Sequence, residues 1–163
     1  MTKKTVNRVK PSNPISGRVA KRLGIAPKAP TKPKKTRSIS KLKKDLDKHI
    51  SLYVRQINAK DGKVKCYTCG RVMDWKQSQC GHFISRSYLA TRFDLNNLRV
   101  QCVGCNVFGG GKPLDFEENL KEELGKKVVE EMKARRHKIM KFSPSWYEMQ
   151  IIIYKDKLKD LTC

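Results

Sequence analysis

Two pairs of cysteines with Cys-x-x-Cys spacing are the strongest chemical signal in the chain, Cys66 with Cys69 and Cys102 with Cys105. Four thiolates in two such pairs match the ligand type and spacing of a closed tetrahedral zinc site, which stabilises small folds whose cores are thin. The intervening segment, residues 70–101, is longer than the roughly 15 to 20 residues of a minimal four-cysteine motif. The pattern therefore predicts a structural zinc site with an insertion that can carry chemistry of its own.

The intervening segment also supplies a competing set of metal ligands. Cys80 and His82 follow the first cysteine pair closely enough to complete a site with it, which would leave the second pair as an orphan or as part of a second site. We favour the four-cysteine set, because two complete pairs form a self-sufficient site. In that interpretation His82 is free for other chemistry, and Cys80 and Cys163 are spare thiols.

The chain is strongly basic, with a net charge of +22 and a pI near 10.0 over 163 residues. The length indicates one domain, and the charge predicts a polyanionic partner, since Lys and Arg contacts to phosphates release counterions. An anionic membrane surface is the rival partner, but no run of about 18 apolar residues predicts a span, and no apolar signal segment follows the basic N-terminus. We therefore expect a cytoplasmic nucleic-acid-binding protein whose cysteines are metal ligands or free thiols.

The positive charge is concentrated at the N-terminus. Residues 1–44 contain fifteen Lys or Arg, five of the seven prolines and no Asp or Glu. Such a segment cannot bury enough apolar surface to offset its ordering entropy, so residues 1–39 are expected to be a disordered basic arm. The arm is expected to follow DNA phosphates without reading sequence, and a solubilising tail is the alternative.

Order is expected to begin near Ser40, which would cap a helix whose apolar stripe packs on the metal site. The stripe consists of Leu42, Leu46, Ile50, Tyr53, Val54 and Ile57. Residues 64–75 are predicted to form a hairpin bent around the first cysteine pair, and a further strand is expected through residues 82–85. The stretch Gly109-Gly110-Gly111-Lys112 would end any helix begun at the second pair, and it lacks the full pattern of a nucleotide-binding P-loop.

The C-terminal third is predicted to be helical, over residues 113–124, from Lys126 onward, and over residues 143–161. The last helix carries an apolar set that is expected in the core, namely Trp146, Met149, Ile152, Ile153 and Leu158. The predicted organisation is an α+β fold in three parts. They are a basic arm over 1–39, a leading helix with a zinc-bound core over 40–112, and a helical segment over 113–163 that packs on the core.

His82 lies inside a longer pattern. Gly81-His82 is followed by Asn97-Leu98-x-x-x-Cys102-x-x-Cys105-Asn106, and the stretch Leu-Gly-Lys-Lys-Val-Val-Glu-Glu occupies residues 124–131. This order of motifs resembles that of the HNH, or His-Me finger, nucleases, and among them it is most similar to the NinG/Rap recombination proteins of lambdoid phages. The resemblance covers about residues 66–132, and it implies a small zinc-stapled ββα-metal core with a leading helix.

The resemblance implies a role for each matching residue. His82 would be the general base that takes a proton from the attacking water, which suits a neutral imidazole. Asn97 would brace the loop opposite the histidine and so fix the orientation of its ring. Asn106 would bind a catalytic Mg²⁺ or Mn²⁺ ion through its amide oxygen.

One position departs from the family pattern. Many HNH nucleases carry Asp directly before the histidine as a second metal ligand, whereas this chain has Gly81, which offers only its carbonyl. Asp74 or Asp94 could supply the missing carboxylate if the fold brought either one close, although aspartates of this kind are more typical of turns.

The implied activity is metal-dependent endonuclease cleavage of branched or partly single-stranded DNA during phage recombination. Basic residues nearest the motif are expected to contact phosphates, with a solvated charged face as the alternative; they are Arg86, Arg92, Arg99 and Lys112. Tyr88 and Phe93 could stack on an unpaired base, but packing is the commoner role of single aromatics.

The rival hypotheses are a non-catalytic zinc protein that binds nucleic acid and a ribosome-associated basic zinc protein. Monomer and homodimer both remain open, since paired cuts at a four-way junction would favour a dimer.

Overall fold

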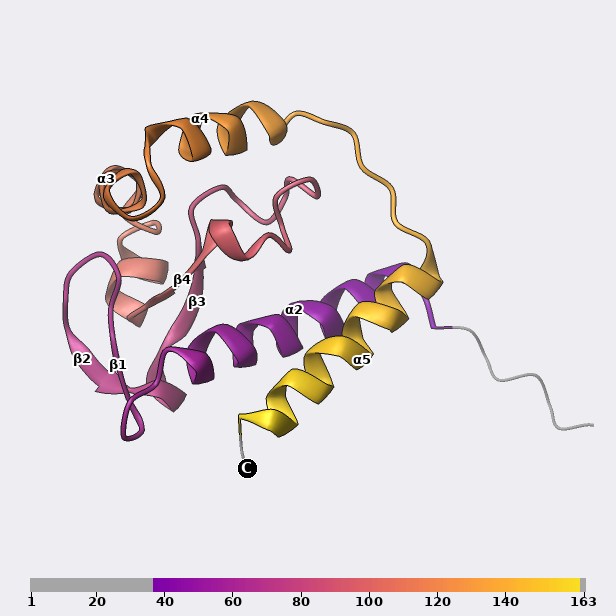
Figure 1. Cartoon of the computed structure of the whole chain (residues 1–163), viewed down its shortest axis with the longest axis horizontal. Coiled ribbons are helices and arrows are strands. Elements are labelled where there is room, and N and C mark those ends of the chain that lie inside the picture. The colour runs from indigo at the N-terminus through magenta and orange to yellow at the C-terminus, as the bar shows by residue number, and fades with distance from the viewer. Residues whose placement is uncertain (1–36, 162–163) are drawn as a thin grey trace, which may run out of the picture. The chain divides into compact units, whose positions relative to one another are not determined.

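The computed structural model describes residues 37–161, which form helices and two small antiparallel sheets (Figure 1). The helices and strands are α2 (Ile39–Ile57), β1 (Lys63–Lys65), β2 (Val72–Asp74), β3 (Gln79–His82), β4 (Leu98–Gln101), α3 (Pro113–Leu124), α4 (Lys126–Arg135) and α5 (Pro144–Asp160). The predicted α+β class is confirmed. Most of the predicted basic arm, as well as Cys163, lies outside the described residues. None of the helices within residues 37–161 is long and apolar enough to cross a membrane.

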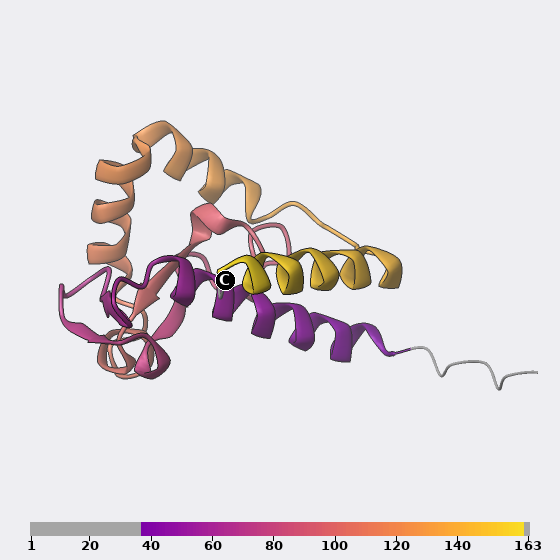
Figure 2. The same ribbon diagram turned by 60° about the horizontal axis from the view of Figure 1, so that its bottom comes forward.

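The leading helix forms where its apolar stripe predicted it. Ser38 caps α2 by accepting a hydrogen bond from the Lys41 N–H at 3.4 Å, so the helix begins before the cap predicted at Ser40. Its buried residues are Leu42, Leu46, Ile50 and Val54. Helix α2 lies beside α5 and also packs on β3 and β4 (Figures 1 and 2). Of the other two residues of the predicted stripe, Tyr53 is partly buried and Ile57 is half exposed.

Helix α5 buries a different face from the one predicted. Its buried residues are Tyr147, Ile151 and Tyr154. The predicted core residues Met149, Ile152 and Ile153 are instead 59%, 59% and 37% exposed. The buried stripe is built around two tyrosine rings, which supply large apolar surfaces, and Tyr154 meets Tyr53 of α2 edge-on with ring centroids 5.5 Å apart. The prediction was wrong because α5 carries apolar residues on several faces, and the predicted set left out Ile151 as well as the two tyrosines.

Each sheet is a two-stranded antiparallel hairpin. Strands β1 and β2 confirm the hairpin predicted beside the first cysteine pair. Strands β3 and β4 pair with His82 opposite Leu98. His82 is therefore the last residue of its strand, so the strand predicted over 82–85 was misplaced, and residues 83–97 form the connection to β4.

Helices α3 and α4 begin where they were predicted, and Gly125 separates them with φ at 87°, a conformation that favours glycine. Both helices pack on the residues that follow His82. The buried cluster there consists of Ile84, Phe116, Leu120, Val129 and Met132. Helix α5 belongs to the other main cluster, with α2, β1 and β4. The C-terminal helices therefore support the β3–β4 hairpin from two separate cores.

Candidate functional site

The structure brings the four predicted cysteines together. The Sγ atoms of Cys66, Cys69, Cys102 and Cys105 all lie within 4.8 Å of one another, and the Sγ atoms of Cys69 and Cys102 are 3.8 Å apart. Three of these side chains are buried, and Cys69 is exposed. In residues 37–161 this is the only group of three or more His, Cys, Asp or Glu that is close enough to hold a metal ion.

The cysteine group has the electrostatics of a site for a soft cation. The Sγ of Cys66 accepts a hydrogen bond from the Cys102 N–H at 3.3 Å, and the Sγ of Cys102 accepts one from the Cys105 N–H at 3.4 Å. Burial would raise the pKa of Cys66, but hydrogen bonds from the Cys102 and Cys69 backbones and from Thr68 lower it to about 6. At Cys105 the Thr68 hydrogen bond lowers the pKa, yet burial and the neighbouring thiols together raise it to about 12. Thiolates this close repel one another, so the donor set fits a cation that prefers sulfur, such as Zn²⁺.

The alternative ligand set is not formed. Cys80 packs against the core that α2 shares with the sheet, and burial raises the pKa of its thiol to about 12. In residues 37–161, neither Cys80 nor His82 belongs to a group that could hold a metal ion together with Cys66 and Cys69. His82 is thereby free of the metal centre.

His82 and Asn106 line one cleft of about 740 Å³. His82 ends β3, and Asn106 lies in a π-helical turn, Gly104–Phe108, that also contains Cys105. Arg55 and Arg86 contribute positive charge to the cleft, and the described residues that line it include no Asp or Glu. The cleft thus combines an imidazole, amide groups and guanidinium groups, a set that suits a phosphate ligand.

The imidazole of His82 is suited to accept a proton. Burial lowers its pKa below the ordinary value near 6.5, and the positive charge of Arg86 lowers it further. The negative charge of Asp47 and a backbone hydrogen bond with Arg92 raise the pKa, but they are the weaker influences. The ring is therefore neutral at pH 7, and a neutral imidazole has one nitrogen that can take a proton.

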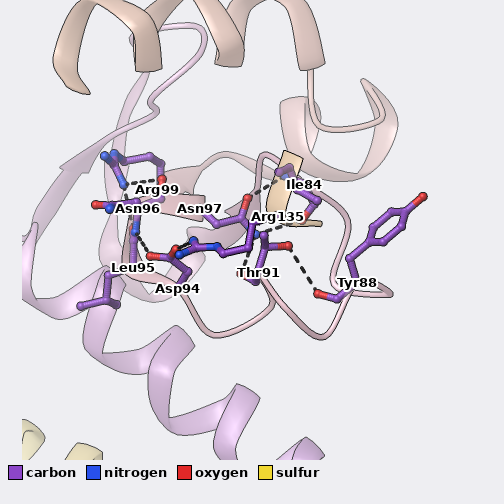
Figure 3. Close-up of polar contacts among 9 residues, drawn as sticks. All are labelled: Ile84, Tyr88, Thr91, Asp94, Leu95, Asn96, Asn97, Arg99 and Arg135. Atoms are coloured by element: carbon purple, nitrogen blue, oxygen red, sulfur yellow. Dashed lines mark hydrogen bonds and ion pairs between the residues drawn. The ribbon is translucent and has the colours of Figure 1, made fainter. Parts of the chain in front are cut away.

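Asn97 fixes the connection that follows His82. It is fully buried, and its Oδ1 accepts a hydrogen bond from the Ile84 N–H at 2.7 Å. Its Nδ2 donates to the carbonyls of Ile84 and Thr91, both at 3.0 Å (Figure 3). Arg135 of α4 adds an ion pair with Asp94 in the same connection. These contacts hold the connection between His82 and β4. The implied role of Asn97 in orienting the ring of His82 stays a prediction.

Two of the four basic residues expected at phosphates are already paired. Arg92 binds Asp47 of α2 through two hydrogen bonds, with Nε–Oδ1 at 3.0 Å and Nη2–Oδ2 at 2.5 Å. Arg99 binds Glu123 of α3 in the same two-pronged way, at 3.0 and 2.8 Å. A bidentate guanidinium–carboxylate pair is among the stronger polar contacts in proteins, so contact with a phosphate would have to displace a carboxylate.

The other two basic residues differ in their relation to the cleft. Arg86 is exposed, lines the cleft, and forms no ion pair within the described part of the chain. Lys112 is also exposed but does not line the cleft; it caps α3 in a left-handed conformation, with φ at 52°. Arg55, which the sequence did not single out, lines the cleft instead and donates to the Ser78 carbonyl at 3.1 Å.

Gln79 is a second cleft residue that sequence reasoning missed. The Nδ2 of Asn106 donates to the Oε1 of Gln79 at 2.5 Å, which orients the Asn106 amide. Gln79 lies two positions before Gly81 on the same strand, and side chains two apart share one face of a strand. Strand alternation could therefore have pointed to Gln79 once Gly81 was recognised as the position of the missing aspartate.

The packing around Gly81 explains the glycine. A Cβ atom at this position would lie 2.1 Å from the Oε1 of Gln101, which lies on the opposite strand, two residues beyond the one that pairs with Gly81. Gln101 is fully buried, and its Nε2 donates to Thr68 at 3.2 Å and to the Gly111 carbonyl at 2.9 Å. An aspartate therefore cannot replace Gly81 unless Gln101 moves.

Neither aspartate that was considered as a replacement lines the cleft. Asp74 accepts a hydrogen bond from the Lys76 N–H at 2.8 Å, and Asp94 accepts one from the Asn96 N–H at 3.0 Å. Each begins a short 3-10 helix, so both serve as turn caps.

The amino-acid sequence matches those of bacteriophage proteins. The profile of the bacteriophage lambda NinG protein family matches residues 21–163. Protein ninG of Salmonella phage P22 is 27% identical over 119 residues, which cover 72% of this chain and 56% of that protein. Protein ninG of Escherichia phage 933W is 25% identical over 119 residues, covering 72% of this chain and 57% of the relative. The chain thus spans little more than half the length of these relatives, and no solved structure matches it. The chain belongs to the bacteriophage lambda NinG protein family.

Proposed function

We propose that this protein is a zinc-stabilised, metal-dependent DNA endonuclease of the HNH, or His-Me finger, type. The observation that carries the proposal is the shared cleft of His82 and Asn106. A two-stranded hairpin, β3–β4, places His82 at the end of its first strand, and a helical turn places Asn106 directly after a zinc-ligand cysteine. This order of strand, strand and helical segment is what a ββα-metal core requires.

His82 acts as the general base in this proposal. One of its ring nitrogens takes a proton from a water molecule, and the water oxygen attacks the phosphorus as the bond to the leaving oxygen breaks. The lowered pKa keeps the imidazole unprotonated at neutral pH, as the role requires. Asn97 and the Asp47–Arg92 pair act as positioning groups, because they hold the connection that leads away from His82.

Asn106 is suited to hold a divalent ion such as Mg²⁺ or Mn²⁺. Its Nδ2 is engaged by Gln79, which leaves its amide oxygen for a hard cation. When bound, the ion would stabilise negative charge on the phosphoryl and leaving oxygens. Asn106 is a neutral ligand, and the described lining of the cleft contains no carboxylate. Phosphate oxygens and water would therefore have to complete the coordination of the ion. We therefore expect weak binding of the ion in the absence of DNA.

Arg55 and Arg86 would hold the phosphates beside the scissile bond, because both line the cleft. Lys112 would contact the DNA outside it. The net charge of +22 supplies sequence-independent affinity. Branched or partly single-stranded DNA, met during phage recombination, is the substrate implied by the family resemblance.

The second candidate function is a non-catalytic zinc protein that binds nucleic acid. The absence of Asp and Glu from the described lining of the cleft favours it, because most sites for Mg²⁺ use at least one carboxylate. An assay of DNA nicking separates the two functions. The zinc-loaded protein should nick flap, four-way or duplex DNA when Mg²⁺ or Mn²⁺ is added, and Asn106→Ala should reduce the rate while zinc content is kept. Absence of metal-dependent nicking on all three substrates would leave the non-catalytic function standing.

A further inference from the structure

An aromatic side chain stands exposed at the edge of the cleft. Phe108 ends the π-helical turn that carries Asn106, and it is 85% exposed. The preceding residue, Val107, is 54% exposed and lines the cleft with His82. Exposed phenylalanine is unfavourable in water, and an exposed apolar group beside a functional cleft commonly marks a contact with a ligand.

The segment that presents Phe108 is held in place. The Gly109 N–H donates to the Gly104 carbonyl at 2.8 Å, and the Gly111 N–H donates to the Cys105 carbonyl at 2.9 Å. The Gly111 carbonyl in turn accepts the hydrogen bond from Gln101 at 2.9 Å. The backbone that carries Phe108 is thus anchored to the cysteine cluster and to β4, so little backbone entropy is lost when a ligand contacts the ring.

Phe83, the aromatic residue in the described lining of the cleft, packs against Phe116 with ring centroids 5.8 Å apart. The two aromatic residues that the sequence suggested for base stacking are engaged in packing as well. Phe93 packs against Trp146 and Tyr147, with ring centroids 6.0 Å apart in each pair. Tyr88 meets His137 edge-on at 6.0 Å and lies under the guanidinium of Arg136. Of the aromatic residues considered for base stacking, none offers a free ring face comparable to that of Phe108.

We propose that Phe108 stacks on an unpaired nucleobase adjacent to the phosphate held in the cleft, and that this contact makes the protein prefer DNA with unpaired bases. The proposal deepens the proposed function and rests on it. Val107 lines the same cleft as Arg55 and Arg86, and Phe108 is the next residue in the chain, so a base attached to a phosphate held there is expected to reach its ring. In a duplex the base faces are covered by their neighbours, so only an unpaired base can offer its face to the ring.

The test compares the affinity for a single strand with that for the duplex of the same sequence, by fluorescence anisotropy without added divalent ions. Phe108→Ala should weaken single-strand binding roughly tenfold, the scale of one lost base–aromatic stack, and leave duplex binding about unchanged. Phe108→Trp should retain single-strand affinity and add tryptophan fluorescence that the single strand quenches. Leu114→Ala is the matched control, because Leu114 is 82% exposed, and it should bind both DNAs like wild type.

Equal losses on single strand and duplex, or no loss on either, would overturn the stacking proposal. A changed sedimentation coefficient for Phe108→Ala with unaltered DNA affinity would also overturn it, since it would make the ring a protein contact. These failures are distinct from failure of the proposed function, which would appear as wild-type protein that neither binds nor nicks any DNA. A wild-type protein that nicks DNA while Phe108→Ala keeps the single-strand preference would reject the stacking proposal alone.

Discussion

Substitution of Gly81 is predicted to destabilise the fold, although many of the HNH nucleases that the motif resembles carry an aspartate there. A Cβ atom would lie 2.1 Å from the Oε1 of Gln101 and 2.7 Å from its Cδ, far inside contact distance. Gln101 can relieve the overlap only by leaving its hydrogen bonds to Thr68 and Gly111. At about 0.5–1.5 kcal/mol for each hydrogen bond, Gly81→Ala should lower the free energy of unfolding by roughly 1–3 kcal/mol, and Gly81→Asp by at least as much.

A double-mutant cycle measured by urea denaturation of the zinc-loaded protein tests this reasoning. Gln101→Ala alone should also destabilise, because it removes the same two hydrogen bonds and leaves a cavity. The double mutant Gly81→Ala with Gln101→Ala should lose less free energy of unfolding than the two single mutants lose together, because the overlap disappears with the Gln101 side chain. Gly81→Ala with wild-type stability, or single effects that simply add, would refute the account of why this position is glycine.

Three further predictions concern the cleft and the cysteine cluster. The rate of nicking should rise with pH through the pKa of His82 and then stay level above neutrality. The reason is that the neutral imidazole is the active form and burial holds its pKa below 6.5. A rate that still rises steeply through pH 8 would contradict this prediction. Asn97→Ala should lower the free energy of unfolding by about 2–4 kcal/mol, since it removes three buried hydrogen bonds, and denaturant curves would show the change. Cys66→Ala should lose bound zinc and cooperative unfolding, whereas Cys80→Ala should keep both, as metal analysis and thermal melts would report.

The parts of the fold that depend on local spacing could be predicted from the sequence. The Cys-x-x-Cys spacing of each pair predicted the metal cluster, and the spacing of Leu42, Leu46 and Ile50 predicted the buried face of α2. Helix α5 could not be predicted in the same way. It carries aromatic and aliphatic residues on several faces, and only the position of α2 decides that Tyr147 and Tyr154 are the ones buried.

The candidate site was predictable only in its chemical groups. The motif indicated that His82 and Asn106 belong together, and the cleft contains both. The carboxylate that pairs with Arg92 could not be predicted, because Asp47 lies 45 residues earlier on a helix and becomes its neighbour only through tertiary packing. The need for glycine at position 81 could not be predicted either, because it arises from the side chain of Gln101 on the opposite strand.

The general-base role of His82 is tested most directly by the nicking rate of His82→Ala on flap DNA in Mg²⁺. Bound zinc and DNA affinity are measured on the same preparation. His82→Ala should keep wild-type zinc content and wild-type DNA affinity. Its nicking rate should be lower by about 10²-fold or more, the usual contribution of a general base. Nicking at the wild-type rate by a His82→Ala protein that is folded and zinc-loaded would contradict the general-base role.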